Sequence, residues 1–199
     1  LNGLDLTLED GDFVTVIGGN GAGKSTMLNA VAGVWPIDMG KILIDGRDIT
    51  RLPEHKRAKY IGRVFQDPMM GTAATMGIDE NLALARRRGQ PRTLRTGISA
   101  KERAEFRELV KTLDLGLEDR MTSKVGLLSG GQRQAITLLM ATLQKPRLLL
   151  LDEHTAALDP KTAAKVLALS DRIVHENNLT TLMITHNMKD AIKYGNRLI

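Results

Sequence analysis

The stretch FVTVIGGNGAGKSTMLNAVAG (residues 13–33) contains, in order, a short apolar run, a glycine-rich loop and a segment with a helical pattern. The apolar run of residues 13–17 stops at glycines, as a buried strand does. Residues 25–32 predict a helix that ends at Gly33, and Pro36 lies just beyond as a stop signal. A strand, a glycine-rich turn and a helix in this order are typical of an α/β fold that holds a phosphate group.

The loop matches the P-loop pattern G-x-x-x-x-G-K-[ST]. Its glycines let backbone N–H groups face phosphate oxygens, and the N-terminus of the following helix adds partial positive charge. Lys24 can reach the β- and γ-phosphates, and the Ser25 hydroxyl can bind Mg²⁺. The alternative, a strand–helix turn with fortuitous glycines, fits poorly with the full motif in this context. The predicted nucleotide-binding residues here are Gly18, Gly19, Asn20, Gly21, Ala22, Gly23, Lys24, Ser25 and Thr26.

The rest of the chain alternates strand-like and helical segments. Apolar residues that alternate or run together predict further strands at residues 4–8, 60–65, 147–153 and 180–185. Asp45-Gly46, between alternating apolar residues, predicts a hairpin. Ser99 and Glu102 form a capping-box sequence that predicts a helix. The expected helices after it cover residues 101–113, 132–143 and 159–177. Strands that alternate with helices indicate an α/β fold with a mainly parallel sheet and an antiparallel β edge.

Length and composition restrict the class of protein. A chain of 199 residues predicts one domain, with a core of residues 1–71 and 144–199 and an inserted helical subdomain of residues 72–143. The absence of cysteine excludes disulfides, cysteine zinc sites and thiol nucleophiles, and favours an intracellular location. The net charge of +5 suits an anionic partner, but nucleotide phosphates satisfy it as well as nucleic acid does. Because the first residue is not Met and the chain stops within a strand-like NRLI, we expect the protein to extend beyond both ends.

Two adjacent acids end the apolar strand of residues 147–153. Ligands of parallel sheets bind at the carboxyl ends of the strands, where the P-loop also lies. Asp152 is expected to hold Mg²⁺, and Glu153 to orient or deprotonate a water that attacks the γ-phosphate. The alternative is that the two acids cap the next helix. Gln66 and His186 each follow a predicted strand, so both are expected at the same edge, although an isolated histidine is more often a surface or hydrogen-bonded imidazole.

A second glycine-rich stretch, VGLLSGGQRQ, occupies residues 125–134. Ser129, Gly130 and Gly131 precede a helix, so they predict a second anion-binding turn with a hydroxyl donor. Alone, such a stretch is as often a purely structural loop.

Taken together, the motifs resemble those of the ATP-binding cassette (ABC) ATPases. LSGGQ at residues 128–132 resembles the family's signature, and it lies between a P-loop and a Walker-B-type strand. Gln66 resembles the Q-loop glutamine, residues 157–159 the D-loop, and His186 the switch histidine. The resemblance covers essentially the whole chain and implies a RecA-like P-loop NTPase core with a helical subdomain.

In this family two cassettes pair head to tail, and the signature of one closes over ATP held by the P-loop of the other. The resemblance therefore implies that a second copy's nucleotide contacts Ser129, Gly130, Gly131, Gln132 and Asp159. It implies that Glu153 is the general base and His186 the γ-phosphate sensor. It implies that Gln66 contacts Mg²⁺ or water and reports to a transmembrane partner, and that Ser25 and Asp152 bind Mg²⁺. His154 departs from the pattern, because proline is usual there.

The resemblance implies the ATP-hydrolysing subunit of a bacterial importer, at the cytoplasmic face of the membrane. Its partners would be a second copy, permease subunits and an extracytoplasmic substrate-binding protein, with no nucleic acid. DEHTAALDP, residues 152–160, resembles the ATPases of importers assigned to tryptophan, tyrosine or related amino acids. The alternative is an ABC ATPase that acts on ribosomes or nucleic acid, motivated by the charge and by five arginines that otherwise indicate a solvated loop. These are Arg86, Arg87, Arg88, Arg92 and Arg95.

Overall fold

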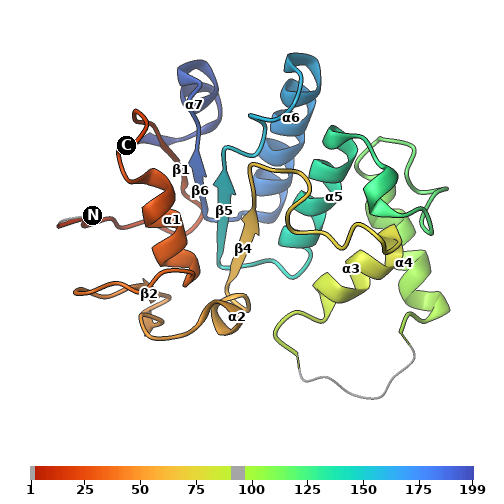
Figure 1. The fold of residues 1–199 in the computed structure, drawn as a ribbon, viewed down its shortest axis with the longest axis horizontal. Coiled ribbons are helices and arrows are strands. Elements are labelled where there is room, and N and C mark those ends of the chain that lie inside the picture. Colours follow the sequence, from red (N-terminus) through yellow and green to blue (C-terminus); the bar gives the residue numbers. More distant parts are fainter. Residues whose placement is uncertain (1–2, 91–96) are drawn as a thin grey trace. The chain divides into compact units, whose positions relative to one another are not determined.

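The computed structural model describes residues 3–90 and 97–199, which form two compact units. The first unit consists of Leu1–Arg63, Lys145–Glu153 and Val174–Ile199, and the second of Val64–Gln144 and His154–Ile173. Figure 1 shows the helices and strands of both units.

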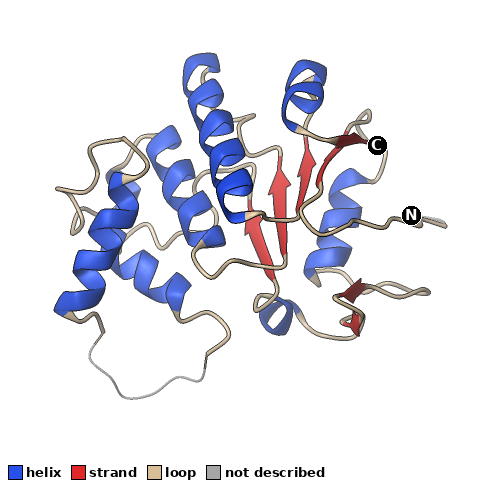
Figure 2. Ribbon diagram, turned by 180° about the vertical axis from the view of Figure 1, so that it is seen from behind, coloured by secondary structure: helices blue, strands red, loops and turns tan. Residues whose placement is uncertain are grey.

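A five-stranded sheet forms the first unit, in the order β4-β5-β6-β1-β7. Its strands are β1 (Phe13–Val16), β4 (Ile61–Val64), β5 (Leu148–Asp152), β6 (Thr181–Ile184) and β7 (Arg197–Leu198). Strand β6 pairs in parallel with both β1 and β5, so that Leu182 lies opposite Val14 on one side and Leu150 on the other. The long strands run in one direction (Figure 2), which brings their carboxyl ends to one edge. The predicted parallel sheet is confirmed.

Helices cover both faces of this sheet. Val14 and Val16 point to one face, where they pack against helix α1 (Lys24–Ala32). Thr15 points to the other face, and its hydroxyl donates to the carbonyl of Ala191 in helix α7 (Met188–Tyr194) at 3.2 Å. Because both faces are covered at the centre of the sheet, β5 and β6 are nearly continuous apolar runs instead of alternating ones.

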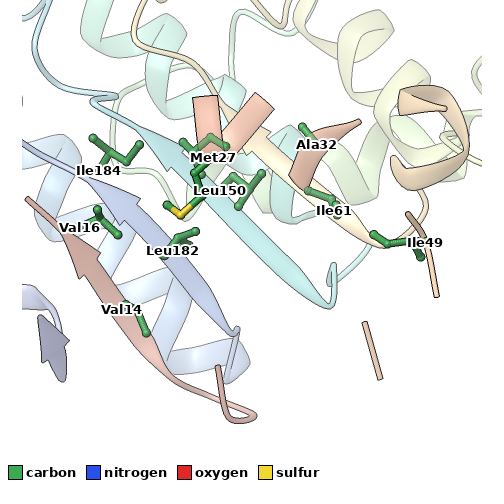
Figure 3. Packing of buried hydrophobic residues seen from close by; sticks show 10 residues of the cluster. Val14, Val16, Met27, Ala32, Ile49, Ile61, Leu150, Leu182 and Ile184 are labelled. Atoms are coloured by element: carbon green, nitrogen blue, oxygen red, sulfur yellow. The ribbon is translucent and has the colours of Figure 1, made fainter. Parts of the chain in front are cut away.

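The core of this unit is aliphatic, as the low aromatic content predicts. Figure 3 shows side chains of α1 packed on those of β1, β5 and β6. The buried cluster consists of Val14, Val16, Met27, Leu28, Ala32, Ile49, Ile61, Leu150, Leu182 and Ile184. Burial of each large aliphatic side chain contributes about 1.5–3 kcal/mol, so this cluster fixes the strands from whose ends the site is built.

The predicted hairpin is also confirmed. Strands β2 (Leu43–Ile44) and β3 (Arg47–Asp48) pair in antiparallel fashion. Asp45 and Gly46 have φ values of 50° and 70° and form the turn, as two positive φ values in a tight hairpin require. A short helix, α2 (Glu54–Arg57), follows, and the sequence pattern did not predict it.

The strand predicted at residues 4–8 is wrong. Residues 4–9 adopt no strand, although Leu6 and Leu8 pack against the core cluster. The alternation correctly indicates that Leu6 and Leu8 share a side facing the core, but Leu4 is exposed. A strand also needs a partner for its backbone hydrogen bonds, and among the described residues this stretch has none in the sheet.

The second unit is helical. It contains α3 (Ile78–Arg86), α4 (Ala100–Lys111), the 3₁₀ helix η1 (Val125–Leu127), α5 (Gly130–Thr142) and most of α6 (Pro160–Asn177), up to Ile173. The predicted capping box is confirmed: the Ser99 hydroxyl accepts from the Glu102 N–H at 3.2 Å, and Glu102 accepts from the Ser99 N–H at 2.9 Å. Within the described ranges, no helix is both long and apolar enough to cross a membrane.

The interpretation of the arginines as a solvated loop is wrong for three of them. Arg86 pairs with Glu105 at 2.7 Å and Arg87 with Glu102 at 3.0 Å. Arg88 donates to the carbonyl of Ala141 at 3.2 Å. The end of α3 lies beside α4 and α5, so these side chains find partners that a local charge pattern cannot show. Arg92 and Arg95 lie outside the described residues.

Candidate active site

The glycine-rich loop connects β1 to α1 at the carboxyl edge of the sheet. Gly21 and Gly23 have φ values of 83° and 90°, which L residues with a side chain rarely adopt. A Cβ placed at Gly19 or Gly21 would meet nothing within 4 Å, so the outer side of the loop is open. Helix α1 begins directly after Gly23, which brings its unpaired N–H groups to the same place. This geometry suits a phosphate chain.

Lys24 lies across this loop. Its Nζ donates to the carbonyls of Gly18 at 2.6 Å and Gly19 at 3.1 Å, and the residue is 9% exposed. The two acceptors that the loop offers to the ammonium group are therefore neutral backbone carbonyls. Phosphate oxygens would supply charged acceptors, which form stronger hydrogen bonds.

Asp152 ends β5, and a cation from the neighbouring strand holds it. The Arg63 guanidinium donates to its carboxylate at 2.9 Å, and both side chains are mostly buried. The motifs predict no role for Arg63, although a lone charge inside an apolar strand indicates that a partner lies nearby. The Asp152 carboxylate and the Ser25 hydroxyl are hard oxygen donors at one sheet edge, which is the chemistry that Mg²⁺ prefers.

Glu153 and His186 meet at this edge from two different strands. His186 Nε2 lies 2.6 Å from Glu153 Oε1, and the carboxylate is the more buried partner. Glu153 has a φ of 46°, which is unusual for a residue with a side chain. Its N–H donates to the carbonyl of Ile184 at 3.1 Å, so the end of β6 fixes this backbone. Strain of this kind is common at functional sites, and a carboxylate oriented by an imidazole is suited to accept a proton.

The other predicted site residues belong to the second unit. Gln66 follows β4 within a loop of residues 65–71. Ser129 is the N-cap of α5: its hydroxyl accepts from the Gln132 N–H at 3.3 Å, and its N–H donates to the Gln132 side chain at 3.1 Å. The sequence analysis missed this second capping box, although a serine followed three residues later by glutamine is its signal.

The structure shows why glycines follow Ser129. Gly130 and Gly131 are the first helical residues of α5, and neither has a positive φ. A Cβ at Gly131 would lie 2.1 Å from the Thr162 methyl group, and one at Gly130 would lie 3.2 Å from Leu158. The pair therefore lets α5 approach the start of α6, and an anion here would meet a helix N-terminus instead of a turn with positive φ.

Asp159 caps α6, as its position before Pro160 predicts. Its carboxylate accepts from the Thr162 N–H at 3.0 Å. Hydrogen bonds from Thr162 lower the pKa of this exposed carboxyl group.

His154 is a buried residue that the sequence analysis left without a role. It is 1% exposed, and its Nε2 lies 2.9 Å from the Ser170 hydroxyl, which itself donates to the Val166 carbonyl at 2.9 Å. Burial lowers the pKa of His154 to about 4. This neutral imidazole ties the chain just after Glu153 to α6.

We expect the stability of the protein to fall in weak acid because of His154. Unfolded histidine has a pKa near 6.5, so the unfolded chain takes up a proton below that pH, whereas the folded chain does so only near pH 4. The stability is complete above pH 6.5 and is lost as the pH falls toward 4, with a loss of roughly 2 kcal/mol between pH 7 and pH 5. Urea unfolding at pH 7 and at pH 5 measures this loss of stability. His154→Gln keeps a hydrogen-bond donor and does not titrate, so its free energy of unfolding should fall by about 2 kcal/mol less between pH 7 and pH 5 than that of the wild type. An equal fall in both proteins would contradict this role of His154.

Comparison with known proteins identifies related chains. The family model described as ABC transporter matches residues 1–156. The "Tyrosine transport ATP-binding protein" of Clostridioides difficile is 48% identical over 196 residues, which cover 98% of this chain and 78% of that protein. The "Methionine import ATP-binding protein MetN" of Rhizobium johnstonii is 39% identical over 193 residues. This match covers 95% of the chain but only 50% of MetN, so the chain spans about half the length of that relative.

Solved structures share the fold. The ATP-binding cassette MJ0796, in a dimeric post-hydrolysis state bound to ADP and Pi, has a TM-score of 0.79 and 30% identity over 98% of this chain and 82% of its own. The protein cbiO1 from Clostridium perfringens, part of the cbiONQ ABC transporter complex, has a TM-score of 0.78 and 25% identity over 100% of this chain and 76% of its own.

Proposed function

The chain belongs to the ABC transporter family of ATP-binding subunits, and from this premise we propose that it hydrolyses ATP to power import through a separate membrane permease. The observation that carries the proposal is the pair of Glu153 and His186, 2.6 Å apart, at the sheet edge that also carries the P-loop. A phosphate-binding loop beside an oriented carboxylate is the arrangement that nucleotide hydrolysis needs.

The P-loop binds the phosphates. Backbone N–H groups of residues 18–26 and the N-terminus of α1 face the β- and γ-phosphates, and Lys24 exchanges the carbonyls of Gly18 and Gly19 for phosphate oxygens. We expect the γ-phosphate to lie at the carboxyl edge of the sheet, within reach of the side chains that follow β5 and β6.

Glu153 and His186 carry the chemical step. Glu153 accepts a proton from a water molecule whose oxygen attacks the γ-phosphorus, and the bond to the β–γ bridging oxygen breaks to give ADP and phosphate. His186 orients the Glu153 carboxylate, donates a hydrogen bond to the γ-phosphate and thereby senses its presence. The buried position of Glu153 beside the half-exposed His186 supports this division of roles.

Mg²⁺ fits the oxygen donors of the site. We propose that Ser25 and Asp152 hold it and that Gln66 completes the contact, directly or through water. When bound there, Mg²⁺ would neutralise part of the negative charge of the phosphates. Arg63 holds the Asp152 carboxylate in place for this purpose.

The signature completes the site of a second copy. Ser129, Gly130, Gly131, Gln132 and Asp159 are proposed to contact the nucleotide that the partner's P-loop binds. The open N-terminus of α5, with Ser129 exposed at its cap, supports this assembly, and so does the dimeric state of MJ0796. ATP binding would close the dimer and hydrolysis would reopen it.

We propose further that residues 1–71 and 144–199 act as the RecA-like core and residues 72–143 as the helical subdomain that meets the permease. The protein would work at the cytoplasmic face of the membrane, with an extracytoplasmic substrate-binding protein. Similarity to a tyrosine transport protein supports an amino acid as the transported substrate.

Purification of the tagged protein from detergent-solubilised cells tests this function. We expect a polytopic membrane protein in stoichiometric amounts and an ATPase activity that the transported amino acid and its binding protein stimulate. Ribosomes or nucleic acid in place of the membrane protein would instead support the alternative function.

A further inference from the structure

Helix α5 contains two residues of the second glycine-rich stretch that have no role in the proposed nucleotide site. Ser129 caps this helix, but Arg133 and Gln134, which end the stretch of residues 125–134, have no part in nucleotide contact. Both contact the loop of residues 65–71, which contains Gln66, and all of these residues belong to the second unit.

Gln134 holds the beginning of this loop. Its side chain is completely buried, and Nε2 donates to the carbonyl of Phe65 at 2.8 Å. Phe65 directly precedes Gln66, so this hydrogen bond fixes the peptide that positions the Gln66 backbone. The other side-chain atom of the amide, Oε1, is buried and has no hydrogen-bond partner among the residues that the structure describes.

Two neighbouring side chains hold the middle and the end of the loop. Arg133 contacts the sulfur of Met69 through Nη1, and the same guanidinium donates to the carbonyl of Gly126 at 2.8 Å. One turn further, Thr137 packs on Gly71: a Cβ there would lie 3.1 Å from the Thr137 methyl group. Since Gly71 also has a φ of 84°, the end of the loop is restricted both in conformation and in space.

From these contacts we propose that Gln134 is a positioning residue that acts through Gln66. It fixes the loop of Gln66 to the helix whose N-cap is Ser129. The hydrogen bond from Gln134 to the Phe65 carbonyl holds the Gln66 backbone in the position that the proposed role of Gln66 requires. The inference rests on the proposed function, in which Gln66 and Ser129 meet two different ATP molecules.

The chemistry of the amide argues against a purely structural role. A buried polar atom without a partner lowers stability, and a methionine would fill a similar volume without that cost. Glutamine is therefore a poor choice for packing alone, whereas its Nε2 donor is what reaches the Phe65 carbonyl.

Gln134→Met tests the proposal in the full-length protein. We expect kcat for ATP hydrolysis to fall about tenfold, because a displaced catalytic group is costly, with KM for ATP unchanged. The temperature of unfolding should change little, because removal of the unpartnered Oε1 offsets the loss of the hydrogen bond to the Phe65 carbonyl. Thr142→Val is the matched control, because it removes a buried hydroxyl at the far end of the same helix; its kcat should equal that of the wild type. Gln134→Leu serves in the same way if Gln134→Met does not fold.

A double-mutant cycle with Gln66→Ala tests whether Gln134 acts through Gln66. If Gln134 acts through Gln66, Gln134→Met causes no further loss of kcat in the Gln66→Ala protein. If the two losses multiply, Gln134 acts independently and the inference is wrong, although Gln66 keeps its proposed role. If Gln66→Ala alone leaves kcat unchanged, the proposed role of Gln66 fails, and the inference with it.

Discussion

Glu153→Gln is expected to lower ATP turnover by about 10²–10⁴-fold, the usual contribution of a general base. The amide keeps the shape of the carboxylate and a hydrogen bond to His186, but it cannot take a proton from water. The P-loop contacts are unchanged, so ATP binding should persist. Because the nucleotide is then not consumed, the closed dimer accumulates, and size-exclusion chromatography with ATP and Mg²⁺ should show it.

The control for this variant is Glu176→Gln, the same chemical change on an exposed residue near the end of α6. We expect wild-type turnover and a dimer that forms and dissociates. The role of Glu153 would be contradicted by turnover close to that of the wild type, or by a Glu153→Gln protein that stays monomeric at saturating ATP.

Ser129→Arg should block hydrolysis while the isolated chain binds ATP almost as well as before. The serine belongs to the second unit, whereas the P-loop, which is proposed to make the chain's own phosphate contacts, belongs to the first unit. In the dimer, the arginine would occupy the space of the partner's γ-phosphate. Loss of a group that stabilises transition-state charge costs about 10²–10³ in rate. Fluorescent nucleotide binding and phosphate release measure the two effects separately.

Ser129→Arg also removes a helix cap, which costs about 1 kcal/mol of stability. Ser99→Arg is therefore the matched control, because Ser99 caps α4 through the same capping box with Glu102. Both variants should unfold at similarly lowered temperatures, but only Ser129→Arg should lose turnover. Equal loss of turnover in both would mean that destabilisation explains the effect.

The sequence predicted the features that depend on local chemistry. Glycines at positive φ, the lysine and the apolar runs define the P-loop, the helix after it and the strands of the sheet. Because parallel strands end at one edge of a sheet, the pattern of strands also predicted that Asp152, Glu153 and His186 share that edge. Whether these residues play the proposed catalytic and metal-binding roles stays a prediction.

Features that depend on partners far along the chain could not be predicted. The contact of Arg63 with Asp152, and that of His154 with Ser170, each join segments that only the fold brings together. The packing of Gly131 against Thr162 likewise depends on the approach of two helices, which no local pattern around Gly131 shows. Arg86 and Arg87 appeared solvated because the acids that pair with them lie on another helix.

The central claim is that each nucleotide lies between the P-loop of one chain and Ser129 of another. Site-directed cross-linking tests it, since the chain has no cysteine of its own. Gly19→Cys and Ser129→Cys are placed on separate chains, both carrying Glu153→Gln, and the mixture is treated with a short bismaleimide. A Cβ at Gly19 meets nothing within 4 Å, so this cysteine should be tolerated.

With ATP and Mg²⁺, we expect a cross-linked product of about twice the chain mass of 21.8 kDa. This product should be absent without nucleotide and absent when either variant is treated alone. The account would be contradicted if the mixture gave no such product under these conditions while a chain carrying both cysteines cross-linked within itself.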